Sequence, residues 1–145
     1  MHCAVCSVCT SRAADYARPM TWLSTRADIE CCYVTTTGRR SGRPHEIEIW
    51  FGVIDDVMYL ISGTGVTADW YLNALAAPEV TVRLGSHTRL GVSRPVVDAD
   101  ERARVGDLMG AKYDWEGDAS IGLSRHDWCY SVPVLAITGW TMPRR

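Results

Sequence analysis

The chain has 145 residues, of which 47% are hydrophobic and 22% are charged, and this profile indicates one compact domain with a sizeable core. Its formal net charge of −2 argues against a protein that binds nucleic acid or anionic membranes through overall charge, so a bound anion must be held by a local patch. No stretch is long and apolar enough for a membrane-spanning helix and no secretory signal is readable, so we expect a cytoplasmic protein.

Residues 1–21 differ in composition from the rest, and we expect a leader here that is disordered or precedes a true start at Met20. The segment contains three cysteines at C-x2-C-x2-C spacing, Cys3, Cys6 and Cys9. This is the spacing of an iron–sulfur run, but Ala13 stands where the fourth cysteine is required. We therefore predict no metal site.

Alternation of apolar and polar residues predicts β-strands over residues 31–37 and 45–53. Asp55 and Asp56 form a tight turn into a third strand, residues 57–62, which completes a hairpin with the second. The first half of the folded domain is therefore expected to be β-structure.

A short helix is expected over residues 70–77, with Thr67 or Asp69 as its N-cap and Pro78 as its stop. Two further strands follow, over residues 79–84 and 87–97. Asp98, with Glu101 three residues later, has the pattern of a capping box that begins a second helix. The residues on one face of that helix are Val105, Leu108 and Met109.

After an irregular aromatic stretch, residues 132–138 form a last buried strand. This pattern has about six strands and two inserted helices, and two helices are too few for a doubly wound α/β sheet. We predict a mainly β, α+β fold over residues 22–145, built as a small closed or split β-barrel.

The loop between the first two strands is the most informative segment. It holds two glycines that allow tight turns, and the polar residues that converge there are Arg39, Arg40, Ser41, Arg43 and His45. Such a loop is typical of a phosphate or polycarboxylate site, and the alternative is a polar hairpin whose arginines are solvated. It is neither a Walker A loop nor a dinucleotide-binding fingerprint, which disfavours nucleotide hydrolysis.

The loop is the first of several motifs that follow one another along the chain. They are residues 33–45 (YVTTTGRRSGRPH), 49–51 (IWF), 59–62 (YLIS), 70–73 (WYLN) and 80–83 (VTVR). Together they resemble the deazaflavin-dependent nitroreductase and quinone reductase family over about residues 30–140. The resemblance implies a six-stranded split β-barrel of the flavin-mononucleotide-binding type. It also implies hydride transfer from reduced coenzyme F420 to a small hydrophobic acceptor, a quinone or a nitroaromatic compound.

The resemblance further implies the site residues. The residues that match the family loop for the cofactor's phosphate and oligoglutamate tail are Gly38, Arg39, Arg40, Ser41, Gly42 and Arg43, and His45 is placed to reach the same anion. Residues placed against the deazaflavin ring are Ile49 and Trp50, and those of the short helix are Trp70 and Tyr71. Ser62 matches a serine near the substrate side.

The acceptor side is less defined. The expected wall includes Ser62, Tyr113, Trp115 and Tyr130, whose aromatic members are alternatively core or dimer-interface residues. Glu48 stands where many members have proline, and Trp50 replaces a tyrosine, so proton donation from that hydroxyl is lost. Glu46 and Glu48 share a strand face, either as a catalytic pair or as two exposed carboxylates.

Two other functions remain open from the sequence. The first is a non-catalytic carrier that binds the deazaflavin or a related flavin. The second is an oxidoreductase that uses FMN, whose single phosphate needs fewer arginines than this loop offers. In each case we expect a small-molecule partner and no nucleic acid, with a monomer or a homodimer as the assembly.

Overall fold

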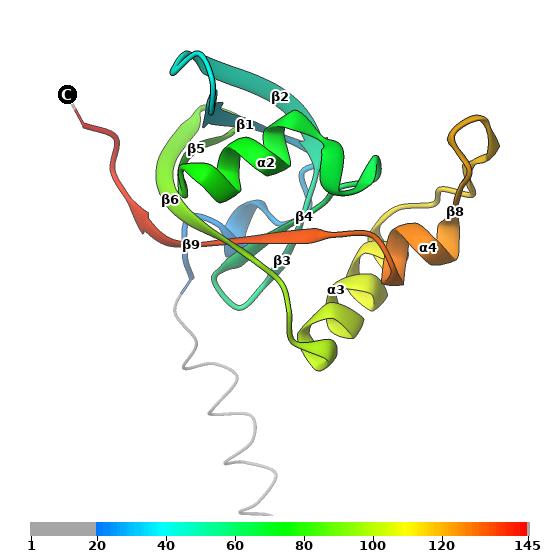
Figure 1. Cartoon of the computed structure of the whole chain (residues 1–145). Helices are drawn as coiled ribbons and strands as arrows, with labels where there is room; N and C mark the ends of the chain where they lie inside the picture. The colour runs from blue at the N-terminus through cyan, green and yellow to red at the C-terminus, as the bar shows by residue number, and fades with distance from the viewer. Residues whose placement is uncertain (1–19, 145) are drawn as a thin grey trace, which may run out of the picture.

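A computed structural model describes residues 20–144 and shows a curled antiparallel sheet with three α-helices in that range (Figure 1). The three N-terminal cysteines and nearly all of the leader predicted for residues 1–21 lie outside the described residues. None of the helices in the described range has the length and apolar character of a membrane-spanning helix.

The main sheet has seven strands. They are β1 (Cys31–Thr37), β2 (Pro44–Trp50), β3 (Gly52–Ile54), β4 (Val57–Ile61), β5 (Glu79–Leu84), β6 (His87–Pro95) and β9 (Val134–Thr141). Their order across the sheet is β2-β1-β5-β6-β9-β4-β3, and every neighbouring pair is antiparallel. The helices are α2 (Asp69–Ala76), α3 (Ala99–Lys112) and α4 (Arg125–Tyr130). A small hairpin of β7 (Gly117–Asp118) and β8 (Leu123–Ser124) precedes α4.

The strand predicted over residues 45–53 is divided at Phe51, so that β2 pairs with β1 whereas β3 pairs with β4. Both backbone groups of Phe51 are bonded to the C-terminal end of α3. Its N–H donates to the Tyr113 hydroxyl (3.1 Å), and its carbonyl accepts from Lys112 Nζ (2.8 Å). Because those two side chains replace ladder partners, the chain can leave one strand pair and enter the next without an unpaired buried group.

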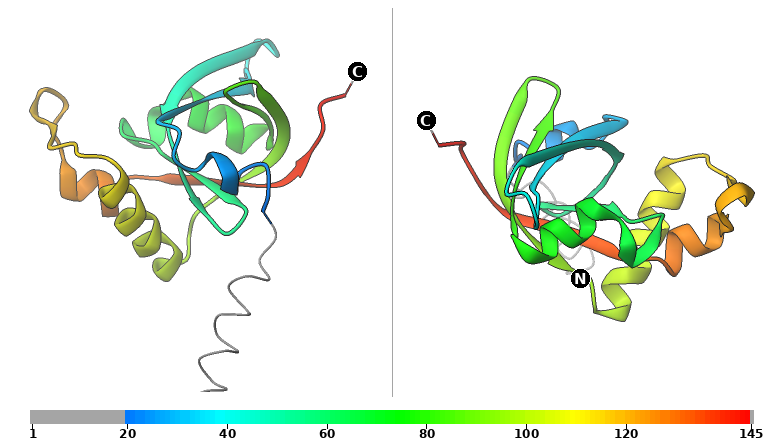
Figure 2. Two further views of the ribbon diagram at one scale, coloured as in Figure 1. Left: turned by 180° about the vertical axis from the view of Figure 1, so that it is seen from behind. Right: turned by 45° about the horizontal axis from the view of Figure 1, so that its top comes forward.

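Two hydrophobic clusters cover opposite faces of β4 and β9. Met58 and Leu60 pack with β1, β5 and α2, whereas Tyr59 and Ile61 pack with α3 and α4. The two strands are therefore buried on both faces, which explains their nearly continuous apolar sequences. Figure 2 shows the curled sheet from two further sides, with α3 and α4 together beside it.

Helix α3 begins as predicted, because the Asp98 side chain accepts a hydrogen bond from the Glu101 N–H (2.8 Å). The Glu101 carboxylate does not return to Asp98. It accepts from the Tyr59 hydroxyl (2.7 Å) and forms a two-pronged ion pair with Arg94, whose Nη2 lies 2.7 Å from Oε2. The arginine holds the pKa of Glu101 at about 2, and burial with the carboxylate contact raises the pKa of Tyr59 to about 12. This network ties α3 to β4 and β6.

Two further expectations are corrected by the structure. The predicted pattern of about six strands and two helices omitted α4, which lies in the stretch expected to be irregular and is capped by Ser124 accepting from the Asp127 N–H (3.0 Å). Helix α2 begins after Ala68, which makes no side-chain cap, so neither Thr67 nor Asp69 is the N-cap. The mainly β, α+β class is confirmed.

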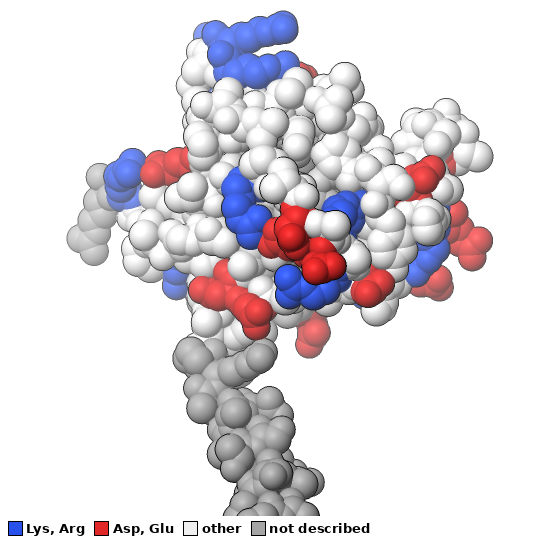
Figure 3. Space-filling model, turned by 60° about the horizontal axis from the view of Figure 1, so that its bottom comes forward, with Lys and Arg blue, Asp and Glu red and all other residues white. Residues whose placement is uncertain are grey.

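Charge is mixed on the outer surface. Figure 3 shows acidic and basic side chains interspersed over the face that it presents. A mixed face does not produce a long-range field of one sign, which agrees with the small net charge.

We predict that Glu101→Gln lowers the free energy of unfolding at neutral pH by up to about 3 kcal/mol, because Arg94 loses its carboxylate partner. The Glu101 pKa is lowered from 4.5 to about 2 by folding, so its stabilisation is present above the higher value and is lost as pH falls through the lower one. Denaturant unfolding at a series of pH values should show the difference between the two proteins shrinking between pH 4.5 and about 2. A difference that stays constant over this range would contradict the assignment.

Candidate functional site

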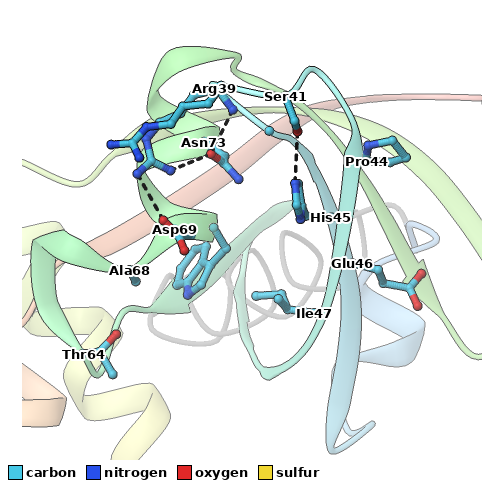
Figure 4. A pocket seen from close by; sticks show the side chains of 13 residues that line it. Arg39, Ser41, Pro44, His45, Glu46, Ile47, Thr64, Ala68, Asp69 and Asn73 are labelled. Carbon is cyan, nitrogen blue, oxygen red and sulfur yellow. Dashed lines mark hydrogen bonds and ion pairs between the residues drawn. The ribbon is translucent and has the colours of Figure 1, made fainter.

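A cavity of about 710 Å³ lies between α2 and the N-terminal half of β2, beneath the loop that joins β1 to β2 (Figure 4). This volume is in the range of small-molecule and cofactor sites. The predicted cofactor residues that line it are Gly38, Arg39, Arg40, Ser41, His45 and Trp70. The residues added by the structure are Pro44, Glu46, Ile47, Thr64, Ala68, Asp69 and Asn73. We call this space the basic cavity.

The loop above the basic cavity is closed by two backbone hydrogen bonds, from the Gly38 N–H to the Arg43 carbonyl and from the Gly42 N–H to the Gly38 carbonyl (both 2.8 Å). A Cβ on Gly38 would lie 2.5 Å from Ser41 Oγ and 2.8 Å from His45 Nε2. A larger residue at position 38 would therefore displace those two polar side chains from the backbone. Gly42 has a φ of +70°, which likewise favours glycine.

Arg39 is anchored to α2 rather than free. Its backbone N–H (3.1 Å) and Nη1 (2.9 Å) both donate to Asn73 Oδ1, and its Nη2 donates to Asp69 (3.1 Å). Asn73 is buried, and its amide also donates to Thr36 Oγ1 (3.4 Å). The loop is thereby fixed to both a strand and a helix. Figure 4 shows the contacts of Arg39 with Asn73 and Asp69 at the top of the basic cavity.

Arg40 and Arg43 are exposed, and neither side chain forms an ion pair within residues 20–144. Arg40 lines the basic cavity, and the Arg43 backbone N–H is held by Ser41 Oγ (3.1 Å). Gly42 and Arg43, which were predicted to bind the cofactor, do not line the cavity. The guanidinium groups of Arg40 and Arg43 belong to the same loop as the anchored Arg39, so this loop is suited to an anion with several charges.

A second cavity, of about 300 Å³, lies at the other end of β2. Its lining residues are Cys31, Glu48, Ile49, Trp50, Ile61 and Trp128. We call it the acidic pocket, because Glu48 is the single carboxylic acid among its lining residues and none of them is lysine, arginine or histidine. Ile49 and Trp50, which were predicted to lie against the cofactor ring, line this pocket and not the basic cavity.

Aromatic residues fix the wall of the acidic pocket. Trp50 stacks on Tyr113 with ring centroids 4.3 Å apart and an interplanar angle of 6°, and Trp128 meets it edge-on at 5.8 Å. The Tyr113 hydroxyl donates to the Glu30 carbonyl (2.6 Å), and burial raises its pKa to about 12. Trp115 packs edge-on against both Trp50 and Trp128 (6.4 and 5.3 Å). Tyr113 and Trp115 therefore support the wall from behind.

The remaining predicted site residues lie elsewhere. Ser62 is fully buried, and its hydroxyl donates to the Gly65 carbonyl (2.6 Å). Tyr71 belongs to the core that α2 covers, and it lines neither of the two cavities. Tyr130 is exposed, bonds Asp107 (2.6 Å) and borders a separate hollow beside α4. The structure thus brings none of these three side chains to the acidic pocket.

The two residues that anchor the loop were not predicted as site residues. Asn73 and Asp69 contact Arg39 of the loop across 34 and 30 positions of sequence. The only local signal was the presence of Asn73 in the motif at residues 70–73. Within the described part of the chain, no group of three His, Cys, Asp or Glu side chains could hold a metal ion.

Solved structures with a similar fold include proteins of different named roles. An F420H2-dependent reductase matches with a TM-score of 0.58 at 20% identity, covering 75% of this chain and 94% of that one. A putative 5-nitroimidazole antibiotic resistance protein from Bacteroides thetaiotaomicron matches at 0.56 and 17% identity, covering 79% and 76%. A domain-swapped dimer matches at 0.58 and 18% identity, covering 90% and 97%. At these identities the likeness shows the fold.

A search of curated proteins finds no match. A family model gives a more specific result, since it matches residues 16–125. This range includes the parts of β1, β2 and α2 that line the two cavities. The match confirms the resemblance seen in the ordered motifs of the sequence. The chain belongs to the F420H(2)-dependent quinone reductase family.

Proposed function

We propose that the chain is an oxidoreductase that uses reduced coenzyme F420 to reduce a small acceptor of the quinone or nitroaromatic type. The observation that carries the proposal is the basic cavity, which is lined by the unpaired Arg40 and by Arg39, fixed by Asn73. The loop above it also carries the unpaired Arg43. Membership of a family named for F420 supports the same cofactor, and the FMN alternative has no support from it.

The donor set suits the charged part of F420, which carries a phosphate and an oligoglutamate tail. Arg40 and Arg43 would hold carboxylates or phosphate through charge-assisted hydrogen bonds, with the tight loop around Gly38 bringing backbone close to the anion. His45 and Trp70 line the interior of the same cavity and would contact the cofactor's uncharged portion. When bound, the reduced deazaflavin supplies a hydride.

The protein's own part is binding, orientation and exclusion of water. The acidic pocket adjoins the same strand and has aromatic and aliphatic walls, so we infer that it holds the acceptor. A pocket walled by Trp50 and Trp128 favours flat molecules.

Finer expectations from the sequence belong to the proposal as well. Because β2 and β3 are separated by Phe51 alone, they can be counted as one bent strand, which supports a six-stranded split barrel of the FMN-binding type. A cytoplasmic location, the folded domain over residues 22–145 and a homodimer stay predictions. Turnover of a dye acceptor by the protein with reduced F420 separates the enzyme from a non-catalytic carrier.

We predict that the double variant Arg40→Ala with Arg43→Ala weakens F420 binding at least about tenfold, because two charge-assisted contacts are removed. It should also flatten the dependence of the dissociation constant on salt, since fewer charges are then screened. Fluorescence titration at low and moderate salt measures both effects.

A matched control is the double variant Arg104→Ala with Arg144→Ala, which removes the same charge away from both cavities. Its affinity should stay close to that of the wild type. Equal weakening in the two double variants would show that overall charge, not the loop, governs binding.

We predict that Asn73→Ala weakens F420 binding about fivefold or more, although Asn73 contributes no charge. The reason is that Arg39 loses both hydrogen bonds to the amide oxygen and the loop loses its fixed position. Leu75→Ala, on an exposed part of the same helix, is the control. Fluorescence titration of the wild type and both variants with F420 measures the three affinities. An unchanged affinity in Asn73→Ala would show that the loop binds F420 without this anchor.

A further inference from the structure

The basic cavity is lined by Arg39 and Arg40 but also by two carboxylates, and each of these carboxylates pairs with an arginine. The acidic pocket, on the same strand, has no such balance of charge. Among its six lining residues Glu48 is a carboxylate, and none is lysine, arginine or histidine. Residues 44–47 of β2 line the basic cavity, whereas residues 48–50 line the acidic pocket. A ligand in the pocket therefore meets a negative charge beside two indole rings.

Neutral groups hold the Glu48 carboxylate in place. Tyr33, its cross-strand partner, donates its hydroxyl to Glu48 Oε2 at 2.6 Å. The Cys31 thiol lies beside the carboxylate, and burial together with Glu48 raises the pKa of that thiol, so the thiol is a neutral donor at neutral pH. Both neighbours orient the carboxylate without cancelling its charge.

The cations that contact residues next to the pocket have other partners. Arg83 stacks over the Tyr33 ring, with its guanidinium carbon 4.1 Å from the ring centroid, and pairs with Glu46 (3.6 Å). Lys112 donates to the Phe51 carbonyl and lies 3.7 Å from the centroid of the Phe51 ring. Glu48 forms no ion pair within residues 20–144, so its charge remains available to a ligand.

We propose that the acidic pocket binds flat aromatic compounds that carry a positive charge or an N–H donor, and that Glu48 selects them. Indole faces attract a cation, and a carboxylate adds a charge-assisted hydrogen bond, so both features of the pocket favour the same ligand class. The wall is rigid because Trp50 stacks on Tyr113. Calling such compounds hydride acceptors rests on the proposed function, whereas the binding selectivity does not.

Direct binding without any cofactor tests the selectivity. Equilibrium dialysis of the purified full chain with three related probes, N-methylacridinium, acridine and acridine carboxylate, compares a cation, a neutral ring and an anion of nearly the same shape. The wild type should bind the cation about five- to tenfold more tightly than the neutral ring and should bind the anion least. Equal affinities, or a preference for the anion, would overturn the proposal.

Glu48→Gln keeps the shape of the side chain and removes its charge, so the preference for the cation should fall about two- to fivefold. Glu79→Gln makes the same change of net charge on β5, where Glu79 pairs with Arg144 (3.1 Å) away from the pocket, and should retain the preference. Thermal unfolding of each variant shows whether it is folded. If Glu48→Gln does not fold, the three-probe comparison on the wild type still decides.

Cys31 reports where the cation binds. It lines the pocket, so bound N-methylacridinium should slow alkylation of Cys31 by iodoacetamide severalfold, followed peptide by peptide by mass spectrometry. Tight binding that leaves Cys31 alkylation unchanged would place the ligand elsewhere and contradict the proposal. A separate titration with F420 keeps the two claims apart, because probe binding without F420 binding refutes the proposed function alone.

Discussion

The arrangement of both cavities depends on how the chain passes Phe51. At this residue β2 leaves β1 and β3 joins β4, and the exchange leaves a buried N–H and carbonyl without ladder partners. Leaving such a group unpaired costs about 1–3 kcal/mol, and the end of α3 removes that cost through Tyr113 and Lys112. Tyr113 also stacks on Trp50, so the same side chain pairs the Phe51 N–H and fixes the wall of the acidic pocket.

The two ends of β2 differ in their uncompensated charge, because Glu46 in its N-terminal half pairs with Arg83, whereas Glu48 forms no ion pair within residues 20–144. The N-terminal half of β2 lies under a loop that carries three arginines, and the C-terminal half carries Glu48 beside Trp50. A polyanionic cofactor is drawn to the first half by charge and an acceptor to the second by aromatic contact and charge. Because the net charge of the chain is only −2, this local separation, and not the overall field, carries the selectivity.

Sequence reasoning predicted the features that have local causes. The strands β1 and β5, the Asp98 cap of α3 and the arginine loop all follow from alternation, capping pattern and composition. The break at Phe51 could not be seen, because apolar alternation continues across it and its cause lies 61 and 62 residues further along the chain. Helix α4 is too short for a periodic signal, and the burial of Tyr71 depends on which face of α2 meets the sheet.

The central claim is that the loop at residues 38–43 binds the cofactor by its charged tail. The most direct measurement is a fluorescence titration of the wild-type protein with F420, with the tail-less 8-hydroxy-5-deazaflavin and with FMN under identical salt. The account predicts the tightest binding for F420, with affinity at least about tenfold weaker without the tail, because Arg40 and Arg43 then have no anion to contact. Equal affinity for the tail-less compound, or a preference for FMN, would contradict it.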